Sequence, residues 1–297
     1  MEPPLLSVCV ITYNHVNYIR QAIEGVLMQK ASFNFNLIIA DDFSTDGTRE
    51  IVLEYKEKCP EKIELILQTQ NVGAAQNWLQ LIHHPKSKYI AYLEGDDYWV
   101  DDRKIQKQVM FLEHNLDFIF TFHNTLDFSE NSSRVMYESL GKTDFDIVDF
   151  IPHTFARSVS IVYRRPDAPL PAIFERIKLG DSALFIYLLQ FGNAKYFEEV
   201  MAHYRIHSSG FWTSRSMRQR VLLRFQLFLD VQKFIKNEYH AVVRNQLYEL
   251  SLTYFINCLF LRQFSLALDG LKYFLLSPLS FKFSKIYRAG RNLVAKA

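Results

Sequence analysis

The first half of the chain alternates between two hydrophobic periodicities, and this alternation constrains the fold more than any other feature. Continuous apolar runs rich in β-branched residues, such as LLSVCVI at 5–11, are each followed by apolar residues at helical spacing. Further runs occur at 35–40, 63–68 and 89–93. Strands that alternate with helices form parallel βαβ units. The sequence therefore predicts an α/β fold whose doubly wound sheet is flanked by helices.

The pattern changes from about residue 118. The stretches DFIFTFH at 117–123 and SVSIVYRR at 158–165 are predicted strands, with a loop-rich segment between them. A short helix is expected from Asp181 to Phe191. Beyond about Arg215 the chain is rich in Phe and has helical spacing. We therefore expect one large domain over 1–215 and a C-terminal helical appendage over 216–297.

Composition and charge exclude several classes of protein. With 49% hydrophobic residues the chain can bury a large core, and a net charge of +2 is too small for a nucleic-acid-binding protein. The cysteines, Cys9, Cys59 and Cys258, lack metal-type spacing, which favours a reducing compartment. No basic leader is present, and the apolar stretch at 250–261 is shorter than the roughly 20 residues that span a bilayer. A cytoplasmic location is expected.

Three of the predicted strands end in polar segments. These are TYN at 12–14, DDFSTDGT at 41–48 and EGDD at 94–97. Ligands of doubly wound sheets bind at the carboxyl ends of the strands, so these segments define the candidate binding edge.

The acidic segment after the fourth strand suits a cation. Glu94 and Asp96, separated by Gly95, offer the oxygen ligands that Mg²⁺ or Mn²⁺ prefers. The alternative is a solvated loop whose acids cap the next helix. In the second segment, Asp42 is suited to accept hydrogen bonds from a base or ribose, whereas residues 44–46 can cap the helix that follows.

The segments SVCVITYN, LIIADDFSTDGT, NVGAAQNW and YIAYLEGDDYW together resemble family 2 glycosyltransferases in order and spacing. The resemblance covers roughly residues 5–210 and implies the GT-A fold. It also implies inverting transfer from a nucleoside-diphosphate sugar, expected to be UDP-linked, with Mn²⁺ or Mg²⁺ as cofactor. The acceptor would be a hydroxyl of a glycan or of a lipid-linked saccharide, as in bacterial cell-surface polysaccharide synthesis.

The resemblance also implies roles for single residues. Asp96 would contact the metal on the diphosphate, and Glu94 would lie near the donor ribose or sugar. The chain differs from a literal Asp-x-Asp element in having Glu94 at the first position. The residues expected to bind the donor are Thr12, Tyr13, Asn14, Asp42, Asn71, Glu94, Gly95 and Asp97.

Two later segments extend the resemblance. LGDSALFIYLLQFG at 179–192 is similar to the segment whose Asp serves as catalytic base, here Asp181, with a helix N-cap as the alternative role. YRIHSSGFW at 204–212 is similar to the family's closing loop, in which His207 would reach the metal or the diphosphate, unless this histidine is structural. Three arginines either help to neutralise the diphosphate or have no specific role: Arg164, Arg165 and Arg205.

Two other functions compete with this interpretation. A sugar-phosphate nucleotidyltransferase uses the same nucleotides on a related sheet, but those enzymes have a glycine-rich basic loop after the first strand, and ITYNHVNY contains neither glycine nor lysine. A catalytically inactive nucleotide-sugar-binding module would not need the set of Asp42, Glu94, Asp96 and Asp181.

The final segment, SFKFSKIYRAGRNLVAKA at 280–297, is basic and contains interleaved apolar residues. It either lies on an anionic membrane leaflet, which would make the enzyme peripheral at the inner face of the cell membrane, or packs on the preceding helices with its charges solvated.

Overall fold

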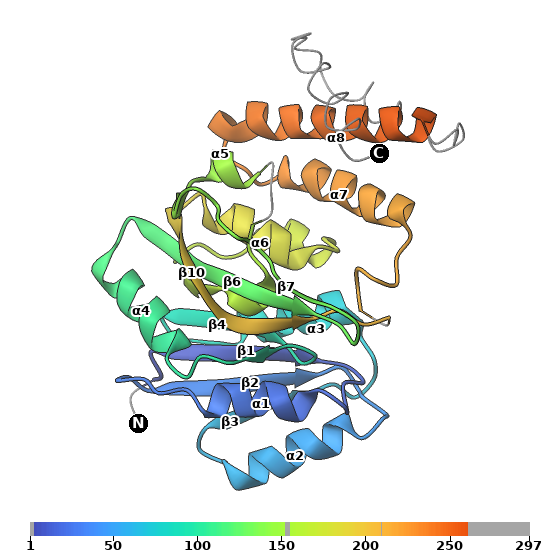
Figure 1. Ribbon diagram of the computed structural model, residues 1–297. Coiled ribbons are helices and arrows are strands. Elements are labelled where there is room, and N and C mark those ends of the chain that lie inside the picture. The colour runs from blue at the N-terminus through green and yellow to red at the C-terminus, as the bar shows by residue number, and fades with distance from the viewer. Residues whose placement is uncertain (1–2, 152–154, 209, 261–297) are drawn as a thin grey trace. The chain divides into compact units, whose positions relative to one another are not determined.

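The computed structural model describes residues 3–151, 155–208 and 210–260, and it divides the chain into two compact units, Met1–Ser214 and Arg215–Ala297. The first unit is built on a sheet of 10 strands. Four parallel strands lie side by side in the order β3-β2-β1-β4 (Figure 1). They are β1 (Leu6–Thr12), β2 (Phe35–Asp41), β3 (Ile63–Leu67) and β4 (Tyr89–Glu94).

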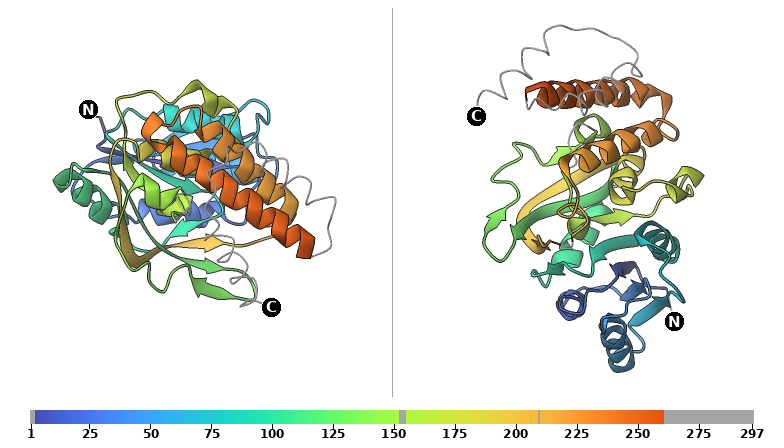
Figure 2. Two further views of the ribbon diagram at one scale, coloured as in Figure 1. Left: turned by 90° about the horizontal axis from the view of Figure 1, so that it is seen from above. Right: turned by 90° about the vertical axis from the view of Figure 1, so that its right-hand side faces the viewer.

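Helices connect these strands, which confirms the βαβ prediction. The connecting helices are α1 (Ile19–Leu27), α2 (Thr48–Lys58) and α3 (Ala74–His83), and β4 is followed by α4 (Lys104–His114). Side chains of a strand point alternately to the two faces of the sheet. Val8 and Val10 belong to a core cluster with residues of α1, α2 and α4. Cys9 points to the opposite face, where its thiol lies 3.9 Å from the carbonyl of Leu81 in α3. Helices therefore cover both faces (Figure 2).

The second half of the unit extends the same sheet and makes it mixed. Next to β4 comes β9 (Val162–Arg164), followed by β6 (Phe118–Phe128) and β10 (Asn193–Arg205). β9 is antiparallel to both β4 and β6, and β10 is parallel to β6. The carboxyl ends of β4, β6 and β10 consequently lie at one edge. Short strands complete the sheet: β5 (Tyr98–Trp99), β7 (Ser133–Val135) and β8 (Asp144–Phe145).

The prediction of a strand over 158–165 is wrong for the first half of this segment. Residues Ser158–Ser160 form a 3₁₀ turn, and only Val162–Arg164 pair as β9. The Ser160 hydroxyl donates to the carbonyl of Arg157 over 2.7 Å, a local bond that competes with ladder pairing. The remaining helical segments are α5 (Ile147–Phe150), a 3₁₀ turn at Ala172–Glu175, and α6 (Gly180–Leu188), which ends before Phe191.

The second unit is helical in its described part. It contains α7 (Met217–Val231), a 3₁₀ turn (Asn237–Tyr239) and α8 (His240–Phe260). Ser216 begins α7 with a capping box completed by Gln219. The rings of Phe225 and Tyr254 lie 6.2 Å apart between the two helices. None of the described helices combines the length and the apolar character needed to cross a bilayer. The basic segment 280–297 lies outside the described residues.

Candidate active site

The polar segments predicted at the strand ends meet at one edge of the sheet. β1 lies between β2 and β4, with Thr12 paired to Asp41 and Ile11 paired to Glu94. Parallel register therefore brings the loops after β1, β2 and β4 together. The end of β10 reaches the same place, because the amide of Arg205 donates to a carboxylate oxygen of Asp97 over 2.7 Å.

Three carboxylates form a cluster after β4. One oxygen from each of Glu94, Asp96 and Asp97 lies within 4.8 Å of the others. Gly95 permits this arrangement, since a Cβ there would lie 2.9 Å from the side chains of both Thr12 and His15. The cluster does not cap α4: the N-cap of this helix is Arg103, which makes no side-chain cap hydrogen bond, and Asp101 accepts the Arg103 amide.

Burial and mutual repulsion shift the acidity of this cluster. Burial, followed by the charges of Asp96 and Asp181, raises the pKa of Glu94 to about 8. Burial and the charges of its two neighbours raise the pKa of Asp97 well above the ordinary range. Only one oxygen of Asp97 is bonded. Its Oδ2 is buried and has no hydrogen-bond partner among the described residues.

Two histidines flank Asp96. The Nε2 atom of His207 lies 2.9 Å from Asp96 Oδ2, and the Nε2 atom of His15 lies 3.9 Å from the same oxygen. Burial alone would raise the pKa of Asp96, but the hydrogen bond with His207 and the proximity of His15 outweigh it, so the pKa lies below its usual value. The other oxygen, Oδ1, is buried without a partner in the described part of the chain.

Arg205, the last residue of β10, contacts the cluster. Its guanidinium donates to the backbone carbonyl of Asp96 over 2.9 Å and lies over the rings of Tyr18 and Phe128, at 4.6 and 4.7 Å from their centroids. The expected role of Arg205 near a diphosphate is compatible with this place. Arg164 is elsewhere, because it pairs with Tyr89 at the start of β4, the opposite end of that strand.

The three residues of the TYN segment have different environments. Thr12 is buried, whereas Tyr13 is 44% exposed and can contact a ligand. Asn14 adopts a positive φ of 54°. The side-chain oxygen of Asn14 accepts a hydrogen bond from the backbone amide of Thr45, and the backbone amide of Asn14 donates to the hydroxyl of Ser44. Asn14 therefore shapes the loop, and Ser44 serves the TYN segment rather than the start of α2.

Asp42 and Asn71 lie next to each other. The two carboxylate oxygens of Asp42 accept the amides of Val72 and Gly73, at 2.7 and 3.0 Å. The side-chain amide of Asn71 donates to the backbone carbonyl of Asp42 over 3.4 Å. Burial nevertheless raises the pKa of Asp42. Asp42 thus holds the NVG loop against β2, and lone pairs remain on its oxygens for a ligand.

Asp181 lies within the first turn of α6. The helix begins at Gly180 with Leu179 as N-cap, so Asp181 is not the capping residue. Its Oδ1 atom accepts the amide of Ser182 over 2.7 Å, and burial raises its pKa. Gly180 packs against Trp78, whose ring would lie 2.9 Å from a Cβ at this position. The carboxylate is therefore held on a rigid support.

Sequence reasoning missed Arg157 and His15. Arg157 pairs with the buried Asp127 over 2.7 Å and lies 4.3 Å from the ring centroid of Tyr204. Its positive charge opposes the effect of burial on the pKa of Asp181. Arg157 lies in the loop-rich stretch, where no pattern distinguishes it. His15 directly follows TYN, and that adjacency was the available signal.

A divalent cation fits this donor set. Buried carboxylate oxygens without partners on Asp96 and Asp97 are the ligand type that hard cations require. His207 adds a nitrogen beside Asp96. The arrangement can thus hold a cation, and Asp181, whose charge acts on Glu94, can accept a proton near it.

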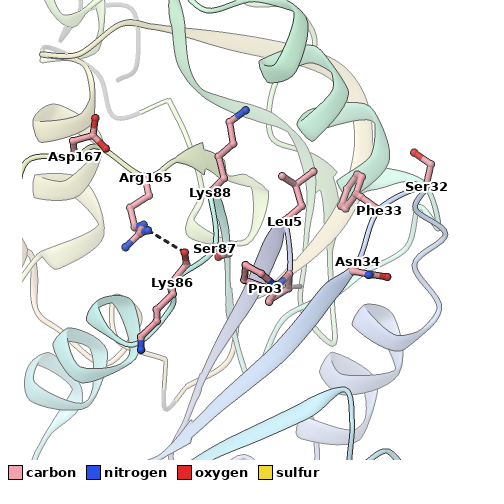
Figure 3. Close-up of a pocket in the computed structure, with 11 residues that line it drawn as sticks. Pro3, Leu5, Ser32, Phe33, Asn34, Lys86, Ser87, Lys88, Arg165 and Asp167 are labelled. Atoms are coloured by element: carbon pink, nitrogen blue, oxygen red, sulfur yellow. Dashed lines mark hydrogen bonds between the residues drawn. The ribbon is translucent and has the colours of Figure 1, made fainter. Parts of the chain in front are cut away.

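A cavity of about 670 Å³ lies at the amino ends of the strands, remote from this cluster. Figure 3 shows it between Leu5, Lys88 and Arg165. Arg165 donates to the backbone carbonyl of Lys86, so the predicted diphosphate role of Arg165 lacks a place at the candidate site.

Comparison with known proteins gives a consistent assignment. Residues 7–167 match the model of glycosyl transferase family 2. An uncharacterized protein of Mycobacterium tuberculosis is 33% identical over 70% of this chain, an alignment that spans 61% of the relative's length. The putative teichuronic acid biosynthesis glycosyltransferase TuaG of Bacillus subtilis is 30% identical over 68% of this chain and 79% of its own.

Solved structures agree in fold. TarS 1–349 of S. aureus, crystallised with UDP, has a TM-score of 0.57 at 16% identity, covering 89% of this chain and 88% of that one. The mannosyltransferase PcManGT of Pyrobaculum calidifontis, in complex with GDP-Man and Mn²⁺, has a TM-score of 0.59 at 15% identity, covering 99% and 81%. The predicted GT-A fold is confirmed.

Proposed function

This chain belongs to glycosyltransferase family 2, and we propose that it transfers a sugar from a nucleoside-diphosphate donor, with inversion, to a hydroxyl of a glycan or lipid-linked saccharide. The observation that carries the proposal is the meeting of two kinds of group at one edge of the sheet. Partnerless carboxylate oxygens on Asp96 and Asp97 offer a cation site, and Asp181 offers a base.

In the proposed reaction the acceptor oxygen attacks the anomeric carbon of the donor. The new carbon–oxygen bond forms as the bond to the diphosphate breaks, and the nucleoside diphosphate leaves with the bonding electron pair. Asp181 accepts the acceptor's proton as a general base, and its raised pKa brings it closer to the working pH.

The leaving group needs positive charge. Asp96 and His207 would hold the divalent cation, with Asp97 and Glu94 beside it, and the bound cation would neutralise the departing diphosphate. Arg205 provides a further cation at the same edge. Tyr13, with its exposed ring, and Asp42 with Asn71 are proposed to contact the nucleotide.

Related proteins support the chemical classes proposed for the donor and the acceptor. TarS was crystallised with UDP and PcManGT with GDP-Man, so a nucleoside-diphosphate donor is compatible with this fold. The relative TuaG is a putative teichuronic acid biosynthesis glycosyltransferase, which supports a saccharide acceptor. A UDP-linked donor, cytoplasmic location and peripheral attachment through 280–297 stay predictions.

The test is release of nucleoside diphosphate from a panel of UDP- and GDP-sugars, measured with Mn²⁺ and with a chelator. Wild type should turn over at least one donor only with the cation, and Asp96→Asn should lose this turnover while remaining folded. Consumption of a nucleoside triphosphate with release of pyrophosphate would instead indicate a nucleotidyltransferase. Tight donor binding without turnover would indicate a binding module.

A further inference from the structure

We propose that His15 is a further ligand of the cation at Asp96, and that the His15–His207 pair makes this site select a transition-metal ion such as Mn²⁺ over Mg²⁺. The inference rests on the proposed function for the presence of the cation and adds its coordination and its selectivity.

Both imidazoles present Nε2 to one oxygen of Asp96, at 3.9 Å for His15 and 2.9 Å for His207. Adjacent ligands of one octahedral ion, each roughly 2.1 Å from it, lie about 3 Å apart, and a wider angle increases this separation. The observed separations therefore allow all three side chains to share one ion. The second oxygen of Asp96, buried and without a partner among the described residues, is an independent sign that something binds here.

The other nitrogen of His15 is already engaged. Its Nδ1 atom lies 3.3 Å from the hydroxyl of Thr12. Metal-binding histidines usually use their second nitrogen in this way, because the bond fixes the ring orientation and the tautomer. Thr12 is buried at the end of β1, so it is a rigid partner. This contact gives the buried Thr12 hydroxyl a role at the site.

The backbone around His15 is held equally firmly. The amide of His15 donates to the hydroxyl of Thr48 over 2.8 Å, and the amide of Val16 donates to the carboxylate of Asp46 over 3.0 Å. The amide of Asn14 donates to Ser44 over 2.9 Å. Side chains of the loop before α2 and of its first residue thus bind three consecutive amides, which fixes the backbone that carries the His15 ring.

A neighbouring aromatic ring covers both imidazoles. Tyr18 lies against both rings, with centroid distances of 6.4 Å to His15 and 5.3 Å to His207, and reduces their contact with water.

Selectivity follows from ligand chemistry. Mg²⁺ takes oxygen ligands and gives up its water reluctantly, whereas first-row transition-metal ions also accept imidazole nitrogen, Mn²⁺ the least strongly among them. Two imidazoles beside one carboxylate therefore favour Mn²⁺ over Mg²⁺. Removing one imidazole should weaken Mn²⁺ binding and leave Mg²⁺ binding nearly unchanged.

The experiment compares Mn²⁺ and Mg²⁺ affinity, by electron paramagnetic resonance and titration calorimetry, for wild type, His15→Gln and His84→Gln. The control is matched, since His84 also lies 2.5 Å from a carboxylate, that of Glu64, but both side chains are exposed. We expect His15→Gln to bind Mn²⁺ about 10-fold or more weakly, with Mg²⁺ affinity within about twofold of wild type. His84→Gln should behave as wild type.

A spectroscopic measurement protects the test against misfolding. In His207→Gln loaded with Mn²⁺, the pulsed-resonance modulation from imidazole nitrogen should persist, because His15 remains. Absence of this modulation would overturn the inference, as would equal losses of Mn²⁺ and Mg²⁺ affinity, or no loss, in His15→Gln. If donor turnover survives any of these results, only the inference fails. His15-dependent Mn²⁺ binding without use of any donor would overturn only the proposed function.

Discussion

The two ends of the same parallel strands differ in how their charges are satisfied. At the amino ends, a cavity of about 670 Å³ is bordered by Lys88, Arg165 and Asp167. Lys88 pairs there with both oxygens of Glu113, at 2.8 and 2.9 Å, and Arg165 bonds to a backbone carbonyl. At the carboxyl ends, within the described residues, lie all the buried carboxylate oxygens that lack a partner: Asp41 Oδ1, Asp96 Oδ1 and Asp97 Oδ2.

Unsatisfied buried charge therefore locates this site better than the position of a cavity does. A buried carboxylate oxygen without a donor costs free energy, and a fold retains one where a ligand repays the cost. The charged side chains that border the cavity are exposed to water, so they carry no such cost. Variants at the carboxyl ends should therefore change catalysis and metal binding, and equivalent variants at the amino ends should not.

The largest expected difference between the two ends concerns two aspartates. Asp181→Asn should lower kcat by at least ~10²-fold, the usual scale for loss of a general base, while donor and Mn²⁺ affinity stay close to wild type. Asp167→Asn, at the exposed amino-end cavity, should leave kcat unchanged. Steady-state kinetics with the accepted donor would measure both. A collapse of donor affinity in Asp181→Asn would make Asp181 a binding residue.

The pH profile tests the same carboxylate. A general base must be deprotonated, so kcat should fall as the pH drops through the pKa of Asp181. Burial raises that pKa, which moves the acid limb of the profile above the range of an ordinary aspartate near 4. A profile that stays flat down to pH ~4 would contradict the assignment.

Alanine substitution at two glycines should cause similar steric clashes, one at the carboxyl ends of the strands and one at their amino ends. A Cβ on Gly95 would lie 2.9 Å from the side chains of His15 and Thr12, and one on Gly192 would lie 2.8 Å from the carbonyl of Asp117. Both alanine variants should lose about 1–3 kcal/mol of unfolding free energy. Only Gly95→Ala should also weaken Mn²⁺ binding, by about 10-fold, because it displaces His15. Denaturant titration and calorimetry would measure the two effects. Equal Mn²⁺ affinity in both variants would contradict the assignment of the cation site to the carboxyl ends of the strands.

The smallest expected effect is a pH-dependent change in stability. Burial raises the folded-state pKa of Asp97, so this residue's contribution to stability is present below about pH 4 and is lost as the pH rises toward the folded-state pKa. In the presence of a chelator, Asp97→Asn should therefore melt higher than wild type by an amount that increases from pH 5 to pH 8. The asparagine oxygen can still accept the Arg205 amide. Asp167→Asn should show no such trend, and a constant difference for Asp97→Asn would contradict the argument.

The local order of this fold was predictable from the sequence. The strands β1 to β4 and the helices between them follow from apolar periodicity, which depends on near neighbours only. The polar strand ends were predictable for the same reason, because a change from an apolar run to TYN, DDFSTDGT or EGDD is visible in the chain itself. The parallel arrangement then placed these ends at one edge.

What the sequence could not determine are the contacts between distant segments. β10 shows register shifts along β6, so its sequence carries no clean alternation to mark it as a strand. Its pairing nevertheless brings the Arg205 amide to Asp97 across 108 residues. The closeness of His15 to Asp96 likewise depends on the order of β1 and β4 in the sheet and on Gly95. Apolar periodicity in the sequence indicates which face of a helix or strand is buried. Which other segment packs against that face is determined only when the whole sheet assembles.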